Sequence, residues 1–168
     1  MSEENSAVGF SNQLGSKELQ QFIDAQHVDA EILPMQGHTS TVSEAALALG
    51  VATEQIIKSL VFRISEAPLL VINNGLARVD RRKLAASLGI GRKRVKFANP
   101  EQALTLTGFV VGSMPPFGHK QKLRTVIDSA VLDMDMIYGG GGDIDAMMRL
   151  TPTELMRVTG AEIMDLSE

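Results

Sequence analysis

The chain has 168 residues, of which 44% are hydrophobic and 21% charged, a composition that excludes a wholly disordered chain and suffices for one packed domain. No apolar run reaches the roughly 18 residues of a membrane-spanning helix. Cysteine is absent. That absence excludes disulfides, cysteine-ligated zinc and a cysteine nucleophile, and it fits a cytoplasmic protein.

The net charge of −4 hides an uneven distribution. Between Arg78 and Arg124 the sequence has 11 basic residues and 2 acidic ones, a local excess of +9, whereas the remaining 5 basic and 18 acidic residues give −13. Such a segment can bind a polyanion locally within an acidic protein. A solvated helix face followed by a charged loop is the alternative explanation, and both stay open at this point.

Capping residues mark the predicted helices, and runs of branched residues mark the strands. The first half is expected to contain a loose leader over 1–14, a helix capped by Ser16, a strand over 30–35, a polar loop over 36–40, a helix between the capping box Thr41-x-x-Glu44 and Gly50, a strand over 56–64, and a hairpin of strands 69–72 and 76–79 around Asn73-Asn74-Gly75.

The second half is expected to contain a helix from Asp80 to Gly89, a strand over 95–97, a helix opened by Asn99-Pro100 and reaching Leu106, an apolar strand over 109–111, a loop over 112–119, short strands over 125–127, 136–138 and 147–150, a helix from Thr151-Pro152 to Gly160, and an edge strand over 162–166. Helices and strands do not alternate regularly, and the predicted hairpin argues against a wholly parallel sheet. The elements therefore predict an α+β fold, with one domain over 15–168.

Lys58 is the first candidate for chemistry, because its neighbours at i±2 on the predicted strand, Ile56 and Leu60, are apolar. A lysine that shares their face is expected to be partly buried, and a buried ammonium needs an anion or a shifted pKa. The alternative is a lysine that reaches the solvent.

Two glycine-rich segments are further candidates. Gly112-Ser-Met-Pro-Pro-Phe-Gly118 combines terminal glycines with two prolines, which predicts a rigid loop able to offer backbone N–H groups to a ligand. Gly139–Gly142 permits close backbone approach but matches neither a dinucleotide fingerprint nor a Walker loop. An ordinary connection and a flexible turn are the respective alternatives.

Other chemistries find no support in the sequence. His27, His38 and His119 do not have metal-ligand spacing, although His38 and His119 lie in loops where they can contact a ligand. No Gly-x-Ser-x-Gly elbow of a serine hydrolase occurs. Six phenylalanines, one tyrosine and no tryptophan are too few for a broad base-stacking platform.

The order of the motifs is more specific than any one of them. The sequence Gln55-Ile-Ile-Lys-Ser-Leu-Val-Phe62 is followed by Lys83-Leu-Ala-x-x-Leu-Gly89, Thr107-Gly-Phe-Val-Val-Gly112, Pro115-Pro-Phe-Gly-His119, the tetraglycine and Leu150-Thr-Pro152. This series, over roughly residues 16–165, resembles the YbaK/EbsC family, the free-standing relatives of the prolyl-tRNA synthetase editing domain.

The resemblance implies a mixed, barrel-like β-sheet surrounded by helices. It also implies an aminoacyl-tRNA deacylase that needs no cofactor or metal and removes wrong amino acids from the acceptor end of tRNA. A tRNA synthetase is a candidate second partner, a membrane is not expected, and the oligomeric state stays open. The implied catalytic residues are Lys58 and Gly112, the substrate-binding residues are His38, Ser113, Met114, Pro115, Pro116, Gly140 and Gly141, and the predicted tRNA contacts are Arg92, Lys93, Arg94, Lys96, Lys120 and Lys122.

Ester hydrolysis needs an activated water and a stabilised oxyanion. We hypothesise that a ribose hydroxyl of the terminal adenosine orients the water, that N–H groups of the Gly112 loop or the glycine tract hold the oxyanion, and that Lys58 holds a phosphate or another substrate oxygen. A non-catalytic module that binds tRNA ends is the main alternative. A general nucleic-acid-binding protein is a third hypothesis.

Overall fold

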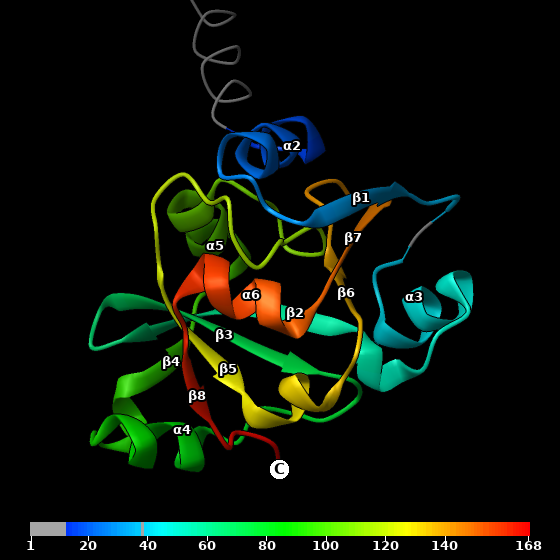
Figure 1. The fold of residues 1–168 in the computed structure, drawn as a ribbon. Helices are drawn as coiled ribbons and strands as arrows, with labels where there is room; N and C mark the ends of the chain where they lie inside the picture. The colour runs from blue at the N-terminus through cyan, green and yellow to red at the C-terminus, as the bar shows by residue number, and fades with distance from the viewer. Residues whose placement is uncertain (1–12, 38) are drawn as a thin grey trace, which may run out of the picture.

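The computed structural model describes residues 13–37 and 39–168. Most of the predicted leader and the predicted substrate contact His38 therefore lie outside the described residues. Within the described part, the helices are α2 (Ser16–Ala25), α3 (Val42–Leu49), α4 (Arg81–Leu88), α5 (Pro100–Thr107) and α6 (Pro152–Thr159), and the strands are β1 (Ala30–Pro34), β2 (Ile57–Ile64), β3 (Ala67–Asn74), β4 (Val95–Phe97), β5 (Arg124–Asp128), β6 (Ile137–Gly140), β7 (Ala146–Leu150) and β8 (Glu162–Met164) (Figure 1).

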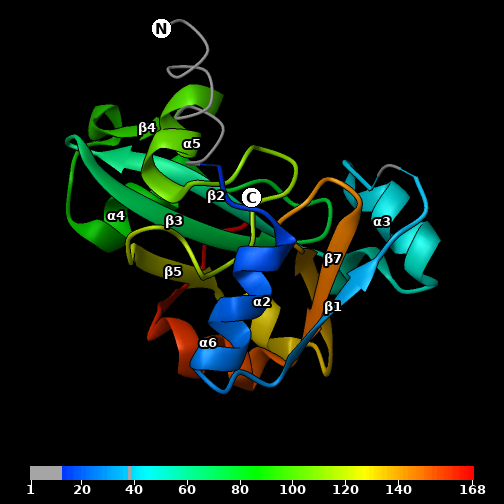
Figure 2. The ribbon, with the colours of Figure 1, turned by 90° about the horizontal axis from the view of Figure 1, so that it is seen from above.

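The strands form two sheets, so the predicted mixed α+β fold is confirmed, but the sheet is not a closed barrel. Five strands lie in the order β4-β2-β3-β5-β8, with parallel pairing of β5 to β3 and of β8 to β5. Three antiparallel strands lie in the order β1-β7-β6. Figure 2 shows the smaller sheet, together with α3, to one side of the larger one. A single bridge between Ile56 and Tyr138 joins them.

The larger sheet is covered on both faces. One face packs in a core cluster with buried residues of α2, α5 and α6, among them Leu19 and Leu155. The opposite face packs against Leu84 and Ala85 of α4. Successive residues of β2 alternate between these faces, as side chains of a strand must, so Val61 belongs to the first cluster and Phe62 to the second.

The predicted helix ends are confirmed because caps are local. Thr41, Asn99 and Thr151 each accept a hydrogen bond from the backbone N–H three residues later, and Asp80 accepts from two N–H groups. Each of these four helices ends at a glycine in the left-handed conformation. The exception is α2, where Gly15 takes the cap position and Ser16 is the first helical residue.

The predicted hairpin is wrong. β3 continues to Asn74, residues 76–79 form no strand, and β2 and β3 are themselves joined as an antiparallel hairpin. Its turn residues, Ser65 and Glu66, both have positive φ, which matches the strand twist but is uncommon without glycine or asparagine. Gly75, at φ 64°, ends β3 instead.

The apolar segment 109–111 also forms no strand. Phe109 is fully buried there, so the segment is apolar because of tertiary packing and not because of sheet pairing. None of the helices described in residues 13–168 combines the length and apolar character needed to span a membrane.

Candidate functional site

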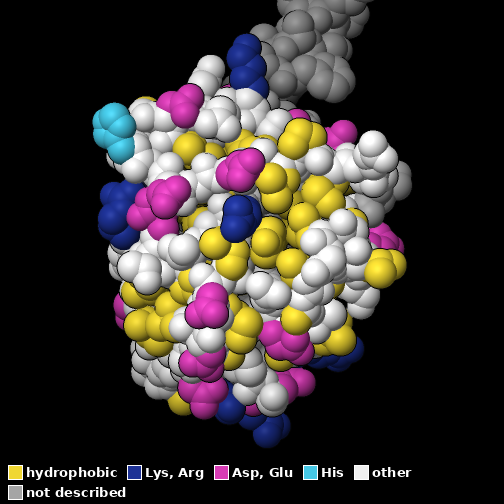
Figure 3. Space-filling model, turned by 45° about the vertical axis from the view of Figure 1, so that its right-hand side comes forward, with side chains coloured by type: hydrophobic (Ala, Val, Ile, Leu, Met, Phe, Trp, Pro, Cys, Tyr) yellow, Lys and Arg dark blue, Asp and Glu magenta, His cyan; other side chains and the backbone are white. Residues whose placement is uncertain are grey.

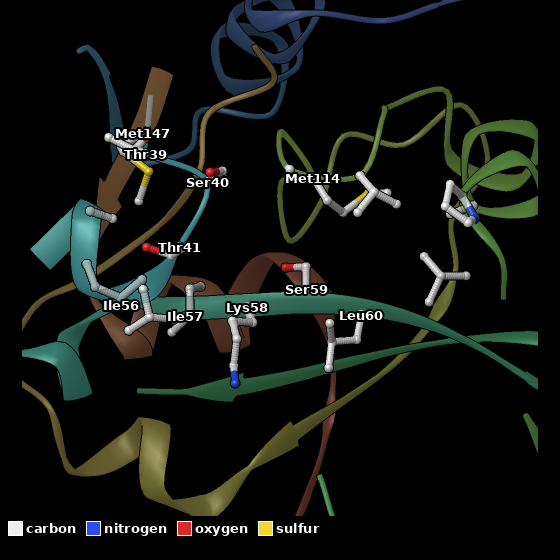
Figure 4. A pocket seen from close by; sticks show the side chains of 18 of the residues that line it. Thr39, Ser40, Thr41, Ile56, Ile57, Lys58, Ser59, Leu60, Met114 and Met147 are labelled. Carbon is white, nitrogen blue, oxygen red and sulfur yellow. The ribbon is translucent and has the colours of Figure 1, made fainter. Parts of the chain in front are cut away.

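A cavity of about 370 Å³ lies along one edge of β2 (Figure 4). Its size is in the usual range for small-ligand sites, and most of its lining is apolar. The lining residues come from the loop before α3, from α3, β2, β4, α5, the loop after α5, β6 and β7: Thr39, Ser40, Thr41, Val42, Ala45, Ile56, Ile57, Lys58, Ser59, Leu60, Val61, Phe97, Ala98, Pro100, Ala103, Val111, Gly112, Met114, Gly140 and Met147.

The cavity exists because β2 is only partly paired on the side away from β3. There β4 pairs with Phe62–Ile64 alone, and the stretch Ile57–Leu60, which we call the open edge, borders the cavity. Successive side chains along the open edge point to opposite faces of the strand, as Figure 4 shows for Lys58 and Ser59. Ser59 lies on the side of Met114 and Thr39, and Lys58 points away from them.

Lys58 is half-buried. This agrees with the expected position on the apolar face of the strand, where the side chain is partly buried. Its ammonium donates a hydrogen bond to the Ala77 carbonyl at 2.8 Å. Burial lowers the pKa of Lys58 below its ordinary value, and the nearby Arg78 guanidinium lowers it further. Neither cation takes part in an ion pair with any carboxylate of the described residues, so the pair forms a positive site beside the open edge.

Asn73 is the cross-strand neighbour of Lys58 and is fully buried. Its amide nitrogen donates to the same Ala77 carbonyl at 2.9 Å. Two donors on one carbonyl hold the 75–79 turn against the hairpin, which fixes the position of the Lys58 ammonium.

The loop over 112–119, which contains five of the residues implied to act on the substrate, has some residues that line the cavity and others that pack behind them. Gly112 is exposed and Met114 is buried, and both line the cavity. Ser113 is fully buried, and its hydroxyl donates to the Val110 carbonyl at 2.9 Å. Pro115 and Pro116 are buried and lie outside the cavity lining. Only two of these five predicted contacts therefore face the cavity.

The glycine tract is structured. Gly139 and Gly140 belong to β6, which contradicts the flexible-turn alternative. A Cβ at Gly140 would lie 2.2 Å from the Met114 carbonyl oxygen, so glycine there allows β6 to lie directly against the loop. Gly142 donates to the Ser113 carbonyl at 3.0 Å. Gly140 lines the cavity, whereas Gly141 packs on the Ala146 backbone outside the lining.

Sequence reasoning missed a group of hydroxyl side chains in the cavity. Thr39, Ser40 and Thr41 lie before α3, and Ser59 faces them from β2 (Figure 4). The period-2 rule that singled out Lys58 also places Ser59 on the face of Val61, so a signal for Ser59 was present. No sequence signal placed residues 39–41 beside β2, because that contact depends on how the two sheets pack.

The predicted tRNA contacts are all exposed. Three of them, Arg92, Lys93 and Arg94, form one turn of 3-10 helix before β4, and Lys96 lies on β4 itself. The next residue, Phe97, lines the cavity, and the Arg81 guanidinium lies 4.6 Å from its ring centre. The basic residues of the 3-10 turn and of β4 therefore adjoin the cavity in sequence through Phe97, and they lie outside its lining.

Lys120 and Lys122 line a second cavity of about 360 Å³, to which Pro116 also contributes.

Figure 3 views the side of the molecule that carries α3, where single basic side chains are scattered among acidic and hydrophobic ones. Within residues 13–37 and 39–168, no three His, Asp or Glu side chains are grouped as a metal site would require.

Comparison with known families matches residues 36–158 to the aminoacyl-tRNA editing domain. The chain belongs to this family. The matched segment contains the whole cavity lining, from Thr39 to Met147. The predicted family is thereby confirmed, and with it the class of activity, hydrolysis of misacylated tRNA.

Individual relatives agree with this assignment. A multifunctional Ser/Thr-tRNA deacylase, ProXp-y of Escherichia coli (strain K12), is 29% identical over 134 residues, which are 77% of each protein. A proline–tRNA ligase of Streptococcus equi subsp. equi is 28% identical over 76% of this chain but only 21% of the ligase. A solved structure described as a candidate trans-editing enzyme for prolyl tRNA synthetase superposes with TM-score 0.83 at 33% identity, covering 91% of this chain and 96% of that one.

Proposed function

We propose that this editing domain acts in trans and binds the aminoacylated 3′-terminal adenosine of tRNA in the cavity along the open edge of β2. The observation that carries the proposal is the convergence of Lys58, Gly112, Met114 and Gly140 on one cavity, although they come from three separate segments of the chain. Two of these segments are glycine-containing backbone and can approach an ester closely.

The reaction we propose needs no covalent nucleophile. A ribose hydroxyl of the substrate orients a water molecule, which attacks the ester carbonyl carbon, and the carbonyl oxygen becomes an oxyanion. The oxyanion then re-forms the carbonyl, the bond from its carbon to the esterified ribose oxygen breaks, and that oxygen takes the proton given up by the water, which releases the free amino acid and the deacylated tRNA. Gly112 lines the cavity at φ 99°, a conformation that favours glycine, and its N–H makes no backbone hydrogen bond to a described residue. We assign this N–H as an oxyanion donor.

Lys58 then has a positioning role. Its ammonium lies on the side of β2 away from the cavity hydroxyls, and burial, followed by the charge of the nearby Arg78 guanidinium, lowers the Lys58 pKa. An anion bound beside these two cations stabilises the charged form of both. The 5′-phosphate of the terminal adenosine is the anion nearest to the scissile ester. We therefore assign Lys58 to this phosphate and not to the bond that breaks.

We infer that the amino acid removed is small. Met114, Ala103 and Val61 give the cavity an apolar wall, and Ser59 and Thr39 add hydroxyl groups to the same lining. Such a wall admits serine, threonine or alanine side chains and excludes large ones by size, at about 1–3 kcal/mol per methylene. The name of the relative ProXp-y, which specifies Ser/Thr-tRNA, supports the hydroxylated members.

The exposed basic residues of the 3-10 turn and of β4 contact acceptor-stem phosphates in this proposal, and Lys120 and Lys122 do so beside the second cavity. A tRNA synthetase that releases the misacylated tRNA is the expected partner, and the cytoplasm is the expected location.

The test is hydrolysis of a panel of alanyl-, cysteinyl-, seryl- and threonyl-tRNA at substoichiometric enzyme. Multiple turnovers on at least one misacylated member, with little on a large-side-chain control such as phenylalanyl-tRNA, are expected. Tight binding of the panel without release of any amino acid would instead identify a non-catalytic module that binds tRNA ends.

A further inference from the structure

The open edge of β2 exposes backbone groups whose direction the surrounding hydrogen bonds determine. Gly75 N–H donates to the Ile56 carbonyl at 2.8 Å on the β3 side, and Ala98 N–H donates to the Val61 carbonyl at 2.9 Å on the opposite side. Backbone groups of successive strand residues point to opposite edges. Ser59, two residues from Val61, therefore directs both its N–H and its carbonyl toward the cavity.

No other strand pairs with these Ser59 groups. The register of β4 begins at Phe62, and the bridge from Tyr138 is made at Ile56. Among residues 13–37 and 39–168, Ser59 is in register with β3 alone, and no backbone hydrogen bond outside the strand pairings involves it. The unpaired N–H and C=O groups of a strand edge can bind another extended backbone. Here these groups face a cavity, which leaves room for a small ligand but not for a further strand.

An esterified amino acid carries the complementary pattern. Its α-amino group is a donor and its ester carbonyl is an acceptor, and they flank one Cα, as N–H and C=O do in a strand residue. Directly opposed residues in an antiparallel hydrogen-bonded pair exchange both bonds in this arrangement. The same recognition operates when extended peptides add to sheet edges, where backbone bonds provide affinity and side-chain pockets provide specificity.

We propose that the backbone of Ser59 binds the aminoacyl group of the substrate, its carbonyl accepting from the α-amino group and its N–H donating to the ester carbonyl. The inference rests on the proposed function and deepens it. It adds a second N–H donor to that of Gly112 at the oxygen that becomes the oxyanion. It also makes recognition of the α-amino group independent of the side chain, which is selected separately by the wall around Met114.

Ser59→Pro tests the N–H contact. Proline removes this N–H, which points away from the β2–β3 ladder, and proline is tolerated at strand edges for that reason. Ser59→Ala is the matched control, because it removes the hydroxyl and keeps the N–H. We expect kcat/KM on the fastest panel substrate to be lower for Ser59→Pro than for Ser59→Ala by about tenfold or more, because both variants lack the hydroxyl and only the proline variant lacks the N–H. Thermal unfolding establishes that both variants are folded.

A substrate series tests the amino contact on the wild-type protein and decides the question if Ser59→Pro does not fold. Alanyl-tRNA is compared with propionyl-tRNA, or seryl-tRNA with 3-hydroxypropionyl-tRNA, each rate divided by its uncatalysed hydrolysis rate because the amino group activates the ester. Loss of the charged donor is expected to lower the normalised kcat/KM by about tenfold to a hundredfold.

Two results overturn the inference while the proposed function stands: a folded Ser59→Pro variant with the same kcat/KM as Ser59→Ala, or equal normalised rates for the amino and deamino esters. If the wild-type protein hydrolyses no member of the panel, the proposed function fails first and this inference fails with it. The two failures are therefore distinguishable by the activity of the wild-type protein.

Discussion

The two halves of β2 have the same strand geometry but opposite surroundings. At the Phe62 end the strand is paired on both sides, and the Phe62 ring is fully buried with its centre 4.1 Å from that of Phe97. At the Ser59 end it is paired on one side only, and Ser59 and Lys58 remain half-buried. The candidate site therefore lies where a neighbouring strand is missing, and the adjoining buried stretch of the same strand holds it in place.

The paired half should be responsible for stability and not for substrate contact. Phe62→Ala is expected to lower the free energy of unfolding by about 3–5 kcal/mol, because a fully buried ring leaves a cavity. Denaturant unfolding measures the loss, with Phe97→Ala as a partly exposed control that should lose less. A loss below about 1 kcal/mol for Phe62→Ala would break the distinction between the two halves.

The open half should be responsible for activity and not for stability. Lys58→Ala is expected to lower kcat/KM on misacylated tRNA by about tenfold to a hundredfold, the effect of one charge-assisted contact, with a melting curve close to wild type. Lys58→Arg is the control that keeps the charge.

A second substrate isolates the phosphate contact assigned to Lys58. On an aminoacyl-adenosine without the 5′-phosphate, Lys58→Ala and wild type should have similar rates. An equal loss on both substrates would mean that Lys58 acts on the ester itself.

Strand β6, which lines the cavity through Gly140, should tolerate no added methyl group at that residue. Gly140→Ala is expected to destabilise the fold by about 1–3 kcal/mol, since the new Cβ meets backbone that cannot rotate away. Gly91→Ala is the control, because a Cβ there meets nothing within 4 Å and φ is not positive. Equal melting temperatures for the two variants would show that β6 and the loop can separate.

The basic residues of the 3-10 turn before β4 should affect tRNA affinity through salt-dependent contacts. Arg92→Glu is expected to raise KM for tRNA and to flatten its dependence on the logarithm of salt concentration, by about one unit of slope per lost phosphate contact. Lys17→Glu, on α2, makes the same charge change elsewhere. Matching slopes for the two variants would exclude a local tRNA contact at the 3-10 turn.

The smallest expected effect concerns His119, whose ring Nε2 lies 2.8 Å from the Pro115 carbonyl of the substrate loop. Burial lowers the pKa of His119 below its ordinary 6.5, and the bond to Pro115 opposes this only in part. The unfolded chain then binds more protons, so this contribution to stability is complete above pH 6.5 and is lost as pH falls toward the folded-state pKa.

The measurement is the melting temperature between pH 7.5 and 5. The wild-type protein should lose more stability over this range than His119→Asn, which cannot titrate. Parallel pH profiles for the two proteins would contradict the linkage.

Much of the fold was predictable because its signals are local. The caps at Thr41, Asp80, Asn99 and Thr151 each depend on hydrogen bonds within a few residues, and all formed as expected.

The hairpin of β2 and β3 was not predictable from its turn. Ser65-Glu66 is a poor type I′ sequence, and the pairing of eight residues on each strand fixes the register instead.

The candidate site was only partly predictable. Lys58, Gly112 and Met114 were found because their residue types are unusual in their context. Ser59 and the hydroxyls of 39–41 were not, because an ordinary serine or threonine becomes notable only when a cavity lies beside it. Ser113 and Pro115 were expected to contact the substrate, but both are buried and lie outside the cavity lining.

The sequence by itself determined the family, the helix boundaries and the chemical types available, because ordered motifs and caps are read over short stretches of chain. The tertiary structure alone decided which edge of β2 stays open and which side of it each residue faces. It also decided that the glycine tract packs against the loop that contains Ser113 and Met114. These features depend on contacts between segments that are far apart in the chain, such as Ile56 and Tyr138, and the geometry of those contacts is set by how the two sheets and their helices bury their apolar faces together.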